Sequence, residues 1–167
     1  MIRTEFSYSK EEIRDFYKFH ITTKGNARLI YNLMALLFAV LGIGVLLIFK
    51  DRLFSLLLLA TSVVVLIIYP VQLNKTINKI VYSTYSRDKQ QIDFYEEYIE
   101  TKIESESKKY TWDQITEVNE TSKYFYFYLG KNNALIVNKN NLNELSINEL
   151  VKLIKCKKGN IILYLKK

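Results

Sequence analysis

The residues that could carry out chemistry in this chain are few and far apart. His20 is the only histidine and Cys156 the only cysteine, whereas a metal site needs several such ligands close together. We expect both to be packing residues. An enzyme would have to use dispersed carboxylates such as Asp93, Glu97 and Asp113, and no glycine-rich phosphate loop, HExxH motif or GxSxG motif occurs. We therefore predict a protein that is not an enzyme, with no catalytic, metal-binding or cofactor-binding residues and no cofactor.

A run of five aromatic residues, Tyr124 to Tyr128, is the most distinctive segment of the polar part of the chain. In a strand, alternation places its three tyrosines on one face and its two phenylalanines on the other. The tyrosine face would suit base stacking or a protein contact, but we favour a central strand that is covered on both faces. Residues 92–145 carry a net charge of −4, and phosphate binding requires clustered Lys and Arg. We therefore expect no nucleic-acid partner.

Two uninterrupted apolar stretches occupy residues 29–49 and 53–73. Each has 21 residues, which as a helix is enough to cross the ~30 Å hydrocarbon layer of a bilayer. Neither contains an Asp, Glu, Lys, Arg or His, which argues against an ion pathway within one chain. The first holds a stripe of small residues, Ala35, Ala39 and Gly42, that would let two helices approach closely. We predict a two-span transmembrane hairpin over residues 29–73, in the cell membrane.

The basic residues beside the spans predict the orientation of this hairpin. Nine of them precede the first apolar stretch or follow the second, and only two, Lys50 and Arg52, lie in the turn between the stretches. Since Lys and Arg accumulate on the cytoplasmic side, we expect both termini in the cytoplasm. The nine are Lys10, Arg14, Lys18, Lys24, Arg28, Lys75, Lys79, Arg87 and Lys89.

The segment before the hairpin combines a strand pattern with a helix. Ile2 to Tyr8 alternates as a strand, and Ser9 with Glu12 forms a capping box for a helix over Lys10 to Thr23. This helix is amphipathic, so it would lie either on the membrane surface or on the soluble domain. We favour the soluble domain, because the preceding strand needs a sheet to join. The apolar stripe is Ile13, Phe16, Tyr17 and His20.

The chain after the hairpin predicts a small β-rich domain. Helix continues through Tyr85, and strands are then expected at 91–95, 98–104, 108–112, 115–121, 123–129 and 134–138, with a turn at 130–133. Ser146 with Glu149 would cap a helix whose apolar face is Ile147, Leu150, Val151 and Ile154, ended by Gly159 and Asn160 before a strand over 161–165. We thus predict an α+β membrane protein, with a cytosolic antiparallel barrel or sheet and a C-terminal helix. The expected parts are 1–28, 29–73, 74–90 and 91–167.

The β-rich tail contains Asp93 to Glu96, Ser105 to Tyr110, Trp112 with Ile115, Glu120, Tyr124 to Leu129 and Ala134 to Lys139. In these segments, and in the order of a strand and helix, a two-span hairpin and a β-rich tail, the chain resembles the YcxB-like membrane proteins of bacteria. The resemblance implies a YcxB-like C-terminal domain similar to pleckstrin-homology folds, and it brings no catalytic residues. Two departures fall at turns or strand ends, Glu97-Tyr98 in place of Asp-Gly and Asn138-Lys139 in place of Pro-Lys.

These observations favour a membrane-tethered interaction module whose cytosolic domain binds a protein or peptide. The alternatives are an accessory or self-assembling component of a transport or envelope-stress system, which would form a homo-oligomer, and an enzyme at the membrane surface. Residues 146–167 carry a net charge of +5 beside a leaflet that attracts cations. We therefore expect contact with anionic lipid, or else simple solvation, for Lys152, Lys155, Lys157 and Lys158.

Overall fold

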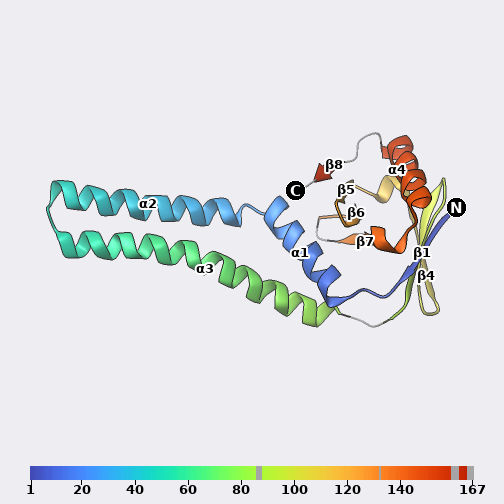
Figure 1. Ribbon diagram of the computed structural model, residues 1–167, viewed down its shortest axis with the longest axis horizontal. Helices are drawn as coiled ribbons and strands as arrows, with labels where there is room; N and C mark the ends of the chain where they lie inside the picture. Colours follow the sequence, from blue (N-terminus) through green and yellow to red (C-terminus); the bar gives the residue numbers. More distant parts are fainter. Residues whose placement is uncertain (86–87, 132, 159–161, 165–167) are drawn as a thin grey trace. The chain divides into compact units, whose positions relative to one another are not determined.

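Figure 1 presents a computed structural model that describes residues 1–85, 88–131, 133–158 and 162–164. The chain divides into two compact units, which we call the β unit, residues 1–16 and 85–167, and the helical unit, residues 17–84. The helix α1 (Lys10–Lys24) contributes to both. The protein therefore belongs to the α+β class, as expected. The predicted helix over Lys10 to Thr23 is confirmed to within one residue.

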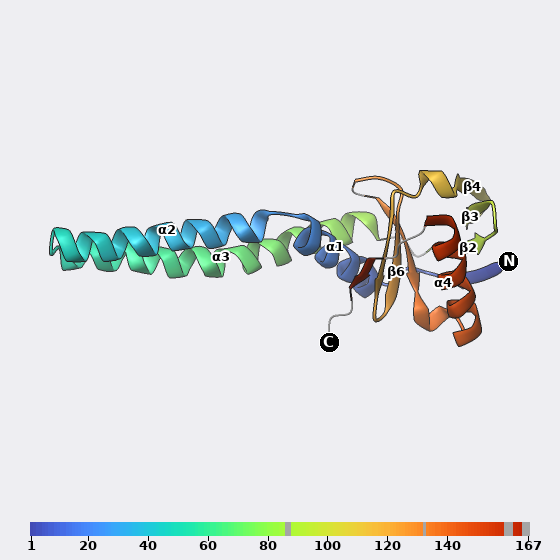
Figure 2. The same cartoon turned by 90° about the horizontal axis from the view of Figure 1, so that it is seen from above.

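The helical unit contains α2 (Ala27–Ile48) and α3 (Arg52–Thr84), joined by a three-residue turn. Lys50 has a φ of 57°, a left-handed conformation that typically ends a helix. Asp51 then caps α3, because its Oδ1 accepts a hydrogen bond of 3.1 Å from the Phe54 N–H. Figure 2 shows α2 and α3 side by side over the length of α2, as a hairpin requires.

Small side chains line the contact between α2 and α3. The Ser55 hydroxyl donates a 2.8 Å hydrogen bond to the Gly42 carbonyl, and the Ser62 hydroxyl donates another of 2.8 Å to the Ala35 carbonyl. A Cβ at Gly42 would lie 3.0 Å from the Leu59 Cγ. Because a side chain larger than hydrogen would separate the helices here, the close approach predicted from the small-residue stripe is confirmed.

Both long helices are apolar on the outside. Leu47 and Leu53 are 72% and 83% exposed, and most of the other large apolar residues in the same stretches are exposed too. The two helices are long and apolar enough to cross a membrane, which is compatible with a membrane protein. Exposed apolar surface on this scale is unusual for a soluble monomer.

The β unit contains two four-stranded sheets. In the first, which we call sheet A, every neighbouring pair is antiparallel and the order is β1-β2-β3-β4. In the second, sheet B, the order is β7-β6-β5-β8, antiparallel except for the parallel pair of β5 and β8. The strands of sheet A are β1 (Ile2–Phe6), β2 (Gln90–Phe94), β3 (Tyr98–Ile103) and β4 (Glu106–Thr111). Those of sheet B are β5 (Glu117–Thr121), β6 (Tyr124–Tyr128), β7 (Ala134–Asn138) and β8 (Ile162–Tyr164).

One apolar cluster joins the two sheets to the helix α4 (Glu144–Lys158). Leu150 and Ile154 of α4 are fully buried in it, and Ile147 and Val151 pack against it, so the predicted apolar face of this helix is confirmed. Four large aromatic side chains are in the same cluster, each at most 5% exposed. They are Phe94, Trp112, Phe125 and Phe127.

A closed barrel is the part of the predicted fold that is wrong, since the strands form two separate sheets. Between β4 and β5 the chain forms the short 3-10 helix η1 (Trp112–Gln114), which interrupts the strand series. At the edge strand β7, the Tyr8 hydroxyl takes the place of a strand. It accepts a 3.2 Å hydrogen bond from the Ile136 N–H and donates one of 3.2 Å to the Ile136 carbonyl. The Tyr8 side chain thus forms the hydrogen bonds with the Ile136 backbone that a neighbouring strand would form in a closed barrel.

Smaller differences concern where elements begin and end. The helix α4 begins at Glu144 rather than at Ser146, because Asn143 is its cap and its Oδ1 accepts a 2.7 Å hydrogen bond from the Ser146 N–H. The strand β4 begins two residues before the predicted start, and Trp112 belongs to η1. The expected helix end at Gly159 and Asn160, the ends of the last strand at 161 and 165, and residue 132 of the predicted turn lie outside the described residues.

Candidate functional site

The tyrosine face of β6 is covered by the N-terminal half of α1. The predicted capping box is present, with the Ser9 N–H donating to Glu12 Oε2 at 2.8 Å and the Glu12 N–H donating to Ser9 Oγ at 3.1 Å. The Phe16 ring then lies 5.4 Å from the Tyr126 ring between centroids. All five residues of β6 are buried, so the interpretation as a central strand covered on both faces is confirmed and this face is not an open stacking platform.

Polar contacts hold the N-terminal half of α1 on sheet B. The Asn138 amide donates to Glu12, and the Tyr124 hydroxyl donates a long bond of 3.4 Å to Asp15. Burial, and then the charge of Asp15, raises the pKa of Tyr124 to about 12, and burial raises that of Tyr8 to about 12. These hydroxyls therefore remain protonated at neutral pH and act as hydrogen-bond donors rather than as reactive groups.

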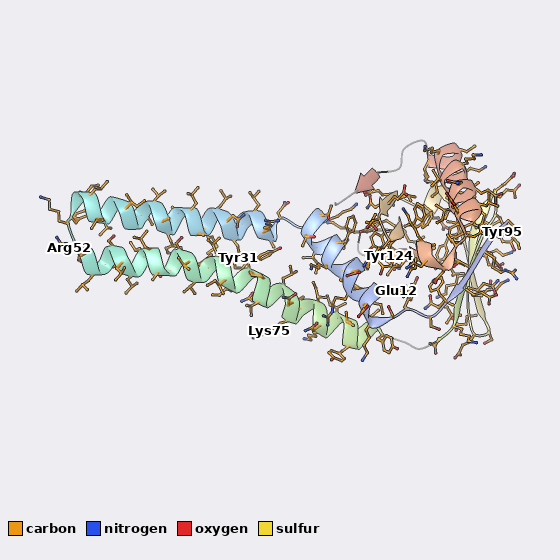
Figure 3. All side chains as sticks on the ribbon, in the orientation of Figure 1. Glu12, Tyr31, Arg52, Lys75, Tyr95 and Tyr124 are labelled. Atoms are coloured by element: carbon orange, nitrogen blue, oxygen red, sulfur yellow. The ribbon has the colours of Figure 1, made fainter. Side chains whose placement is uncertain are left out.

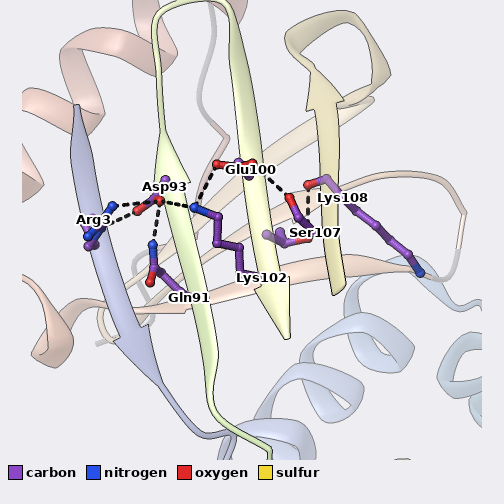
Figure 4. Close-up of polar contacts among 8 residues, drawn as sticks. Arg3, Gln91, Asp93, Glu100, Lys102, Ser107 and Lys108 are labelled. Atoms are coloured by element: carbon purple, nitrogen blue, oxygen red, sulfur yellow. Dashed lines mark hydrogen bonds and ion pairs between the residues drawn. The ribbon is translucent and has the colours of Figure 1, made fainter. Parts of the chain in front are cut away.

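The outer face of sheet A carries a connected set of charged and amide side chains, drawn in Figure 4. Asp93 is at its centre, where it accepts hydrogen bonds from Arg3 Nε at 2.8 Å and from Gln91 Nε2 at 2.6 Å. The Lys102 ammonium lies 3.6 Å from Asp93 and 3.2 Å from Glu100. The strand register explains this set, because Arg3, Asp93 and Glu100 are directly opposite one another on β1, β2 and β3.

The electrostatics of this network keep its carboxylates ionised. Burial by itself raises the pKa of Asp93, but the hydrogen bonds from Arg3 and Gln91, with the charges of Arg3 and Lys102, outweigh burial and lower it below the ordinary value. The pKa of Glu100 is also lowered, first by the hydrogen bond from Ser107 and then by Lys102. The positive charges of Arg3 and Lys102 balance the negative charges of Asp93 and Glu100, and the network links β1, β2 and β3. Since both carboxylates stay ionised, neither is suited to act as a general acid.

We predict that Asp93→Asn destabilises the β unit by about 1 to 3 kcal/mol at pH 7, since the variant loses charged hydrogen bonds at a fully buried carboxylate. Because the folded pKa of Asp93 is depressed, its contribution is present above the ordinary pKa of 3.8 and disappears as the pH falls through the folded value. The emission of Trp112, the single tryptophan, would follow urea unfolding of the full chain in detergent. Glu97→Gln is the control, since it removes an equal charge from an exposed turn. Equal losses in the two variants would contradict the prediction.

A shallow hollow of about 600 Å³ adjoins this network, where β1 and β3 end and β2 begins. Two basic residues, Lys89 and Lys102, and two acidic residues, Glu5 and Glu104, line it together with polar and apolar neighbours. Glu104 has a φ of 51°, which places it in a tight turn between β3 and β4. The mixture of charges suits contact with a polypeptide better than it suits one small ion.

The strand β4 forms an open edge beside the network. Within the described ranges it pairs with β3 alone, and five of its six residues are exposed, Tyr110 being half-buried. The Tyr95 and Tyr98 rings stack 4.6 Å apart near this edge, and the Lys109 ammonium lies 4.8 Å above the Tyr98 ring. Unpaired backbone groups and a half-exposed aromatic pair thus occur together.

The sequence-predicted residues are not brought together into one site. Asp93 is neutralised in the network, and within the described part of the chain it shares no hydrogen bond or ion pair with Glu97 or Asp113. His20 is half-buried, whereas Cys156 is exposed and therefore does not pack as expected, since it lies two residues beyond the buried Ile154. The described residues contain no group of three or more His, Cys, Asp or Glu side chains placed to hold a metal. On α4, Lys152, Lys155 and Lys157 are exposed and Lys158 is half-buried.

Two buried polar side chains of the β unit could not be identified from the sequence. The Asn119 amide and the Thr4 hydroxyl are buried and have no hydrogen-bond partner among the residues that the structure describes. Asn119 pairs with Tyr126 in the register of β5 and β6, so both lie on the face of sheet B toward α1. A polar residue at an inward strand position is the only signal that could have identified either of them.

Comparison with known proteins gives one family match. Residues 94–154, from the end of β2 to within α4, match the family model described as YcxB-like protein. Neither the curated proteins nor the solved structures include a match to this chain. Hydrogen bonds order the chain at both positions where the sequence departs from the family pattern. At Glu97-Tyr98, the Tyr98 carbonyl accepts a 2.9 Å bond from the Tyr95 N–H. At Asn138-Lys139, Asn138 Oδ1 accepts a 3.0 Å bond from the Asn140 N–H. The expected resemblance is therefore confirmed over these strands and this helix, since residues 94–154 match the YcxB-like family model.

Proposed function

We propose that this protein is a non-enzymatic, membrane-anchored interaction module that binds an extended segment of a partner protein along β4. The observation that carries the proposal is the open edge of sheet A, where β4 is exposed and is paired on one side only among the described residues. An extended peptide can add to such an edge as a further strand, with main-chain hydrogen bonds supplying affinity.

Charge indicates what kind of segment would bind. Residues 90–113, which include β2, β3 and β4, carry a net charge of −4. The excess lies at the hairpin turns, where Glu96 and Glu97 occupy one end and Glu104 and Glu106 the other. A basic segment would gain electrostatic complementarity and a faster encounter. The pleckstrin-like relationship inferred from the sequence is part of this proposal, because binding modules of that class also present sheet surfaces.

The anchor would be the α2–α3 hairpin with both termini in the cytoplasm. Exposed apolar helices of sufficient length and the nine-to-two distribution of flanking basic residues support this topology. We predict that reporter fusions after Lys24 and after Lys167 both read cytoplasmic, and that a fusion after Asp51 reads external. Figure 3 shows Arg52 beside this position at the hairpin turn. Finding the two termini on opposite sides of the membrane would contradict the two-span hairpin.

Site-specific photo-crosslinking in native membranes tests the binding edge. A photoreactive side chain at Ser107 or Lys108 of β4 is expected to capture one defined foreign protein. The same group at Leu145 of α4, which is 75% exposed, is the matched control. Glu104→Gln with Glu106→Gln is expected to reduce capture, as is added salt. Equal capture from β4 and from Leu145, or none from β4, would contradict the proposal.

Self-assembly is the second candidate function. The spans could associate between chains through small residues, but Ala35 and Gly42 already contact the returning helix of the same hairpin. Fewer small-residue surfaces therefore remain for a partner hairpin. Crosslinks from β4 only to a second copy of this chain would favour this alternative. The expected contact of the α4 lysines with anionic lipid is compatible with either candidate and stays a prediction.

A further inference from the structure

The helical unit contains a hollow of about 320 Å³ that the proposed function does not use. It lies among the C-terminal half of α1, the first turns of α2 and the middle of α3, and all of its lining residues belong to this one unit. Small-molecule sites begin at about this size. Arg28 and Asn32 of α2, with Leu66, Tyr69 and Pro70 of α3, form most of its wall.

Two polar groups of this hollow have no partner in the described part of the chain. Arg28 makes no ion pair or hydrogen bond there, and no acidic side chain lines the hollow. The Tyr69 hydroxyl is buried and lacks a hydrogen-bond partner. The neighbouring Tyr31 differs, since its hydroxyl donates a 3.2 Å bond to Gln72 Oε1 while its ring lies 5.3 Å from that of Tyr69. Buried polar groups normally have a hydrogen-bond partner. The Tyr69 hydroxyl lacks one beside the positively charged Arg28, which indicates that the hollow binds a polar, negatively charged group.

The position of the hollow along the helices indicates the source of such a group. Arg28 immediately precedes the first apolar stretch, and Pro70 lies near the end of the second. Both ends therefore fall where the predicted spans meet the lipid headgroups. Exposed Leu66 and the apolar surfaces beyond it continue from the hollow along the helices, where they would meet acyl chains.

We propose that this hollow binds the phosphodiester of an anionic membrane phospholipid. Arg28 is its charged contact, because a guanidinium matches phosphate oxygens with paired N–H donors. The Tyr69 hydroxyl donates a further hydrogen bond, and the Asn32 amide is the third polar group within reach of the hollow. This inference rests on the membrane insertion that the proposed function includes, and it does not depend on any protein partner.

Lipid retention by the full chain in non-ionic detergent micelles tests this site, with native mass spectrometry as the readout. The probes are phosphatidylglycerol, diacylglycerol with the same acyl chains, and inorganic phosphate. Wild-type protein is expected to retain phosphatidylglycerol well above diacylglycerol, and millimolar phosphate is expected to displace little of it. Arg28→Gln is expected to weaken phosphatidylglycerol binding about tenfold and Tyr69→Phe about threefold, in keeping with a lost charged and a lost neutral hydrogen bond.

Two control variants change residues of the same types, one arginine and one tyrosine, that do not contribute an unpaired group to the hollow. Arg52→Gln removes an arginine at the opposite end of the hairpin, and Tyr31→Phe removes a hydroxyl that already has a partner; each is expected to change binding less than twofold. Arg28→Lys should recover part of the affinity, which separates charge from misfolding. Equal retention of diacylglycerol, or an equal loss in Arg52→Gln, would overturn the site. If inorganic phosphate bound as tightly as phosphatidylglycerol, the site would be a phosphate site and not a phospholipid site. Failure of membrane insertion is detected separately, by extraction of the chain from membranes at high pH.

Discussion

Residues 85–167 expressed alone are expected to fail to fold, whereas the same residues joined to residues 1–16 by a Gly/Ser linker are expected to form a soluble domain. The reason is that the β unit is discontinuous in sequence. The strand β1 pairs with β2 over five residues and places Ile2 in the core, and Phe16 of α1 covers β6. Removing the side chains of Ile2 and Phe16 alone costs roughly 5 to 10 kcal/mol, which is comparable with the ~5 to 15 kcal/mol that stabilises a typical domain.

The emission maximum of Trp112 and the dispersion of backbone NMR signals would distinguish the two forms. The linked form is expected to show a buried tryptophan and a cooperative urea transition, whereas residues 85–167 alone are expected to show an exposed one and to aggregate through the uncovered edge of β2. A linked form in which residues 1–16 are scrambled is the control, because it keeps length and composition. A cooperative transition for residues 85–167 alone would show that β1 and α1 are dispensable.

The elements that could be predicted from the sequence are those with local signals. The capping box of Ser9 and Glu12 needs only residues three apart, and it forms as expected. The apolar face of α4 and the short apolar run of β7 are equally local signals, and the predicted strand at residues 134–138 matches β7. Small residues in α2 also predicted their own contact, because the returning helix follows after only three residues.

Features that depend on distant partners could not be predicted in the same way. Nothing in the pattern of β1 indicates that it pairs with β2 almost ninety residues later, or that the Tyr8 hydroxyl occupies the edge of β7. The start of α4 was misplaced for another reason, since Asn143 and Ser146 are both good caps and only the fold selects between them. The hollow at Arg28 and Tyr69 likewise forms only when three helices meet.

Replacement of Trp112 by Ala is expected to destabilise the β unit by about 3 to 5 kcal/mol, the usual cost of truncating a buried large aromatic side chain. Trp112 is 5% exposed, packs edge-on against Phe127 at 6.4 Å between ring centroids, and donates its Nε1–H to the Tyr95 carbonyl at 3.2 Å. It also belongs to η1, which separates β4 of sheet A from β5 of sheet B. The variant therefore loses core volume at the corner that joins the two sheets.

Hydrogen exchange of the full chain in detergent would measure this effect, because it needs no tryptophan and reports on each strand. We expect Trp112→Ala to accelerate exchange across β3, β5 and β6 together and to leave α2 and α3 unchanged, since the two helices belong to the other unit. Trp112→Phe keeps most of the apolar area and loses the hydrogen bond to Tyr95, so its effect should be intermediate. Leu145→Ala, at an exposed position of α4, should change stability by less than about 0.5 kcal/mol. If Trp112→Ala were as stable as Leu145→Ala, Trp112 would not be a core residue, and its exposure would make it part of a binding surface near β4.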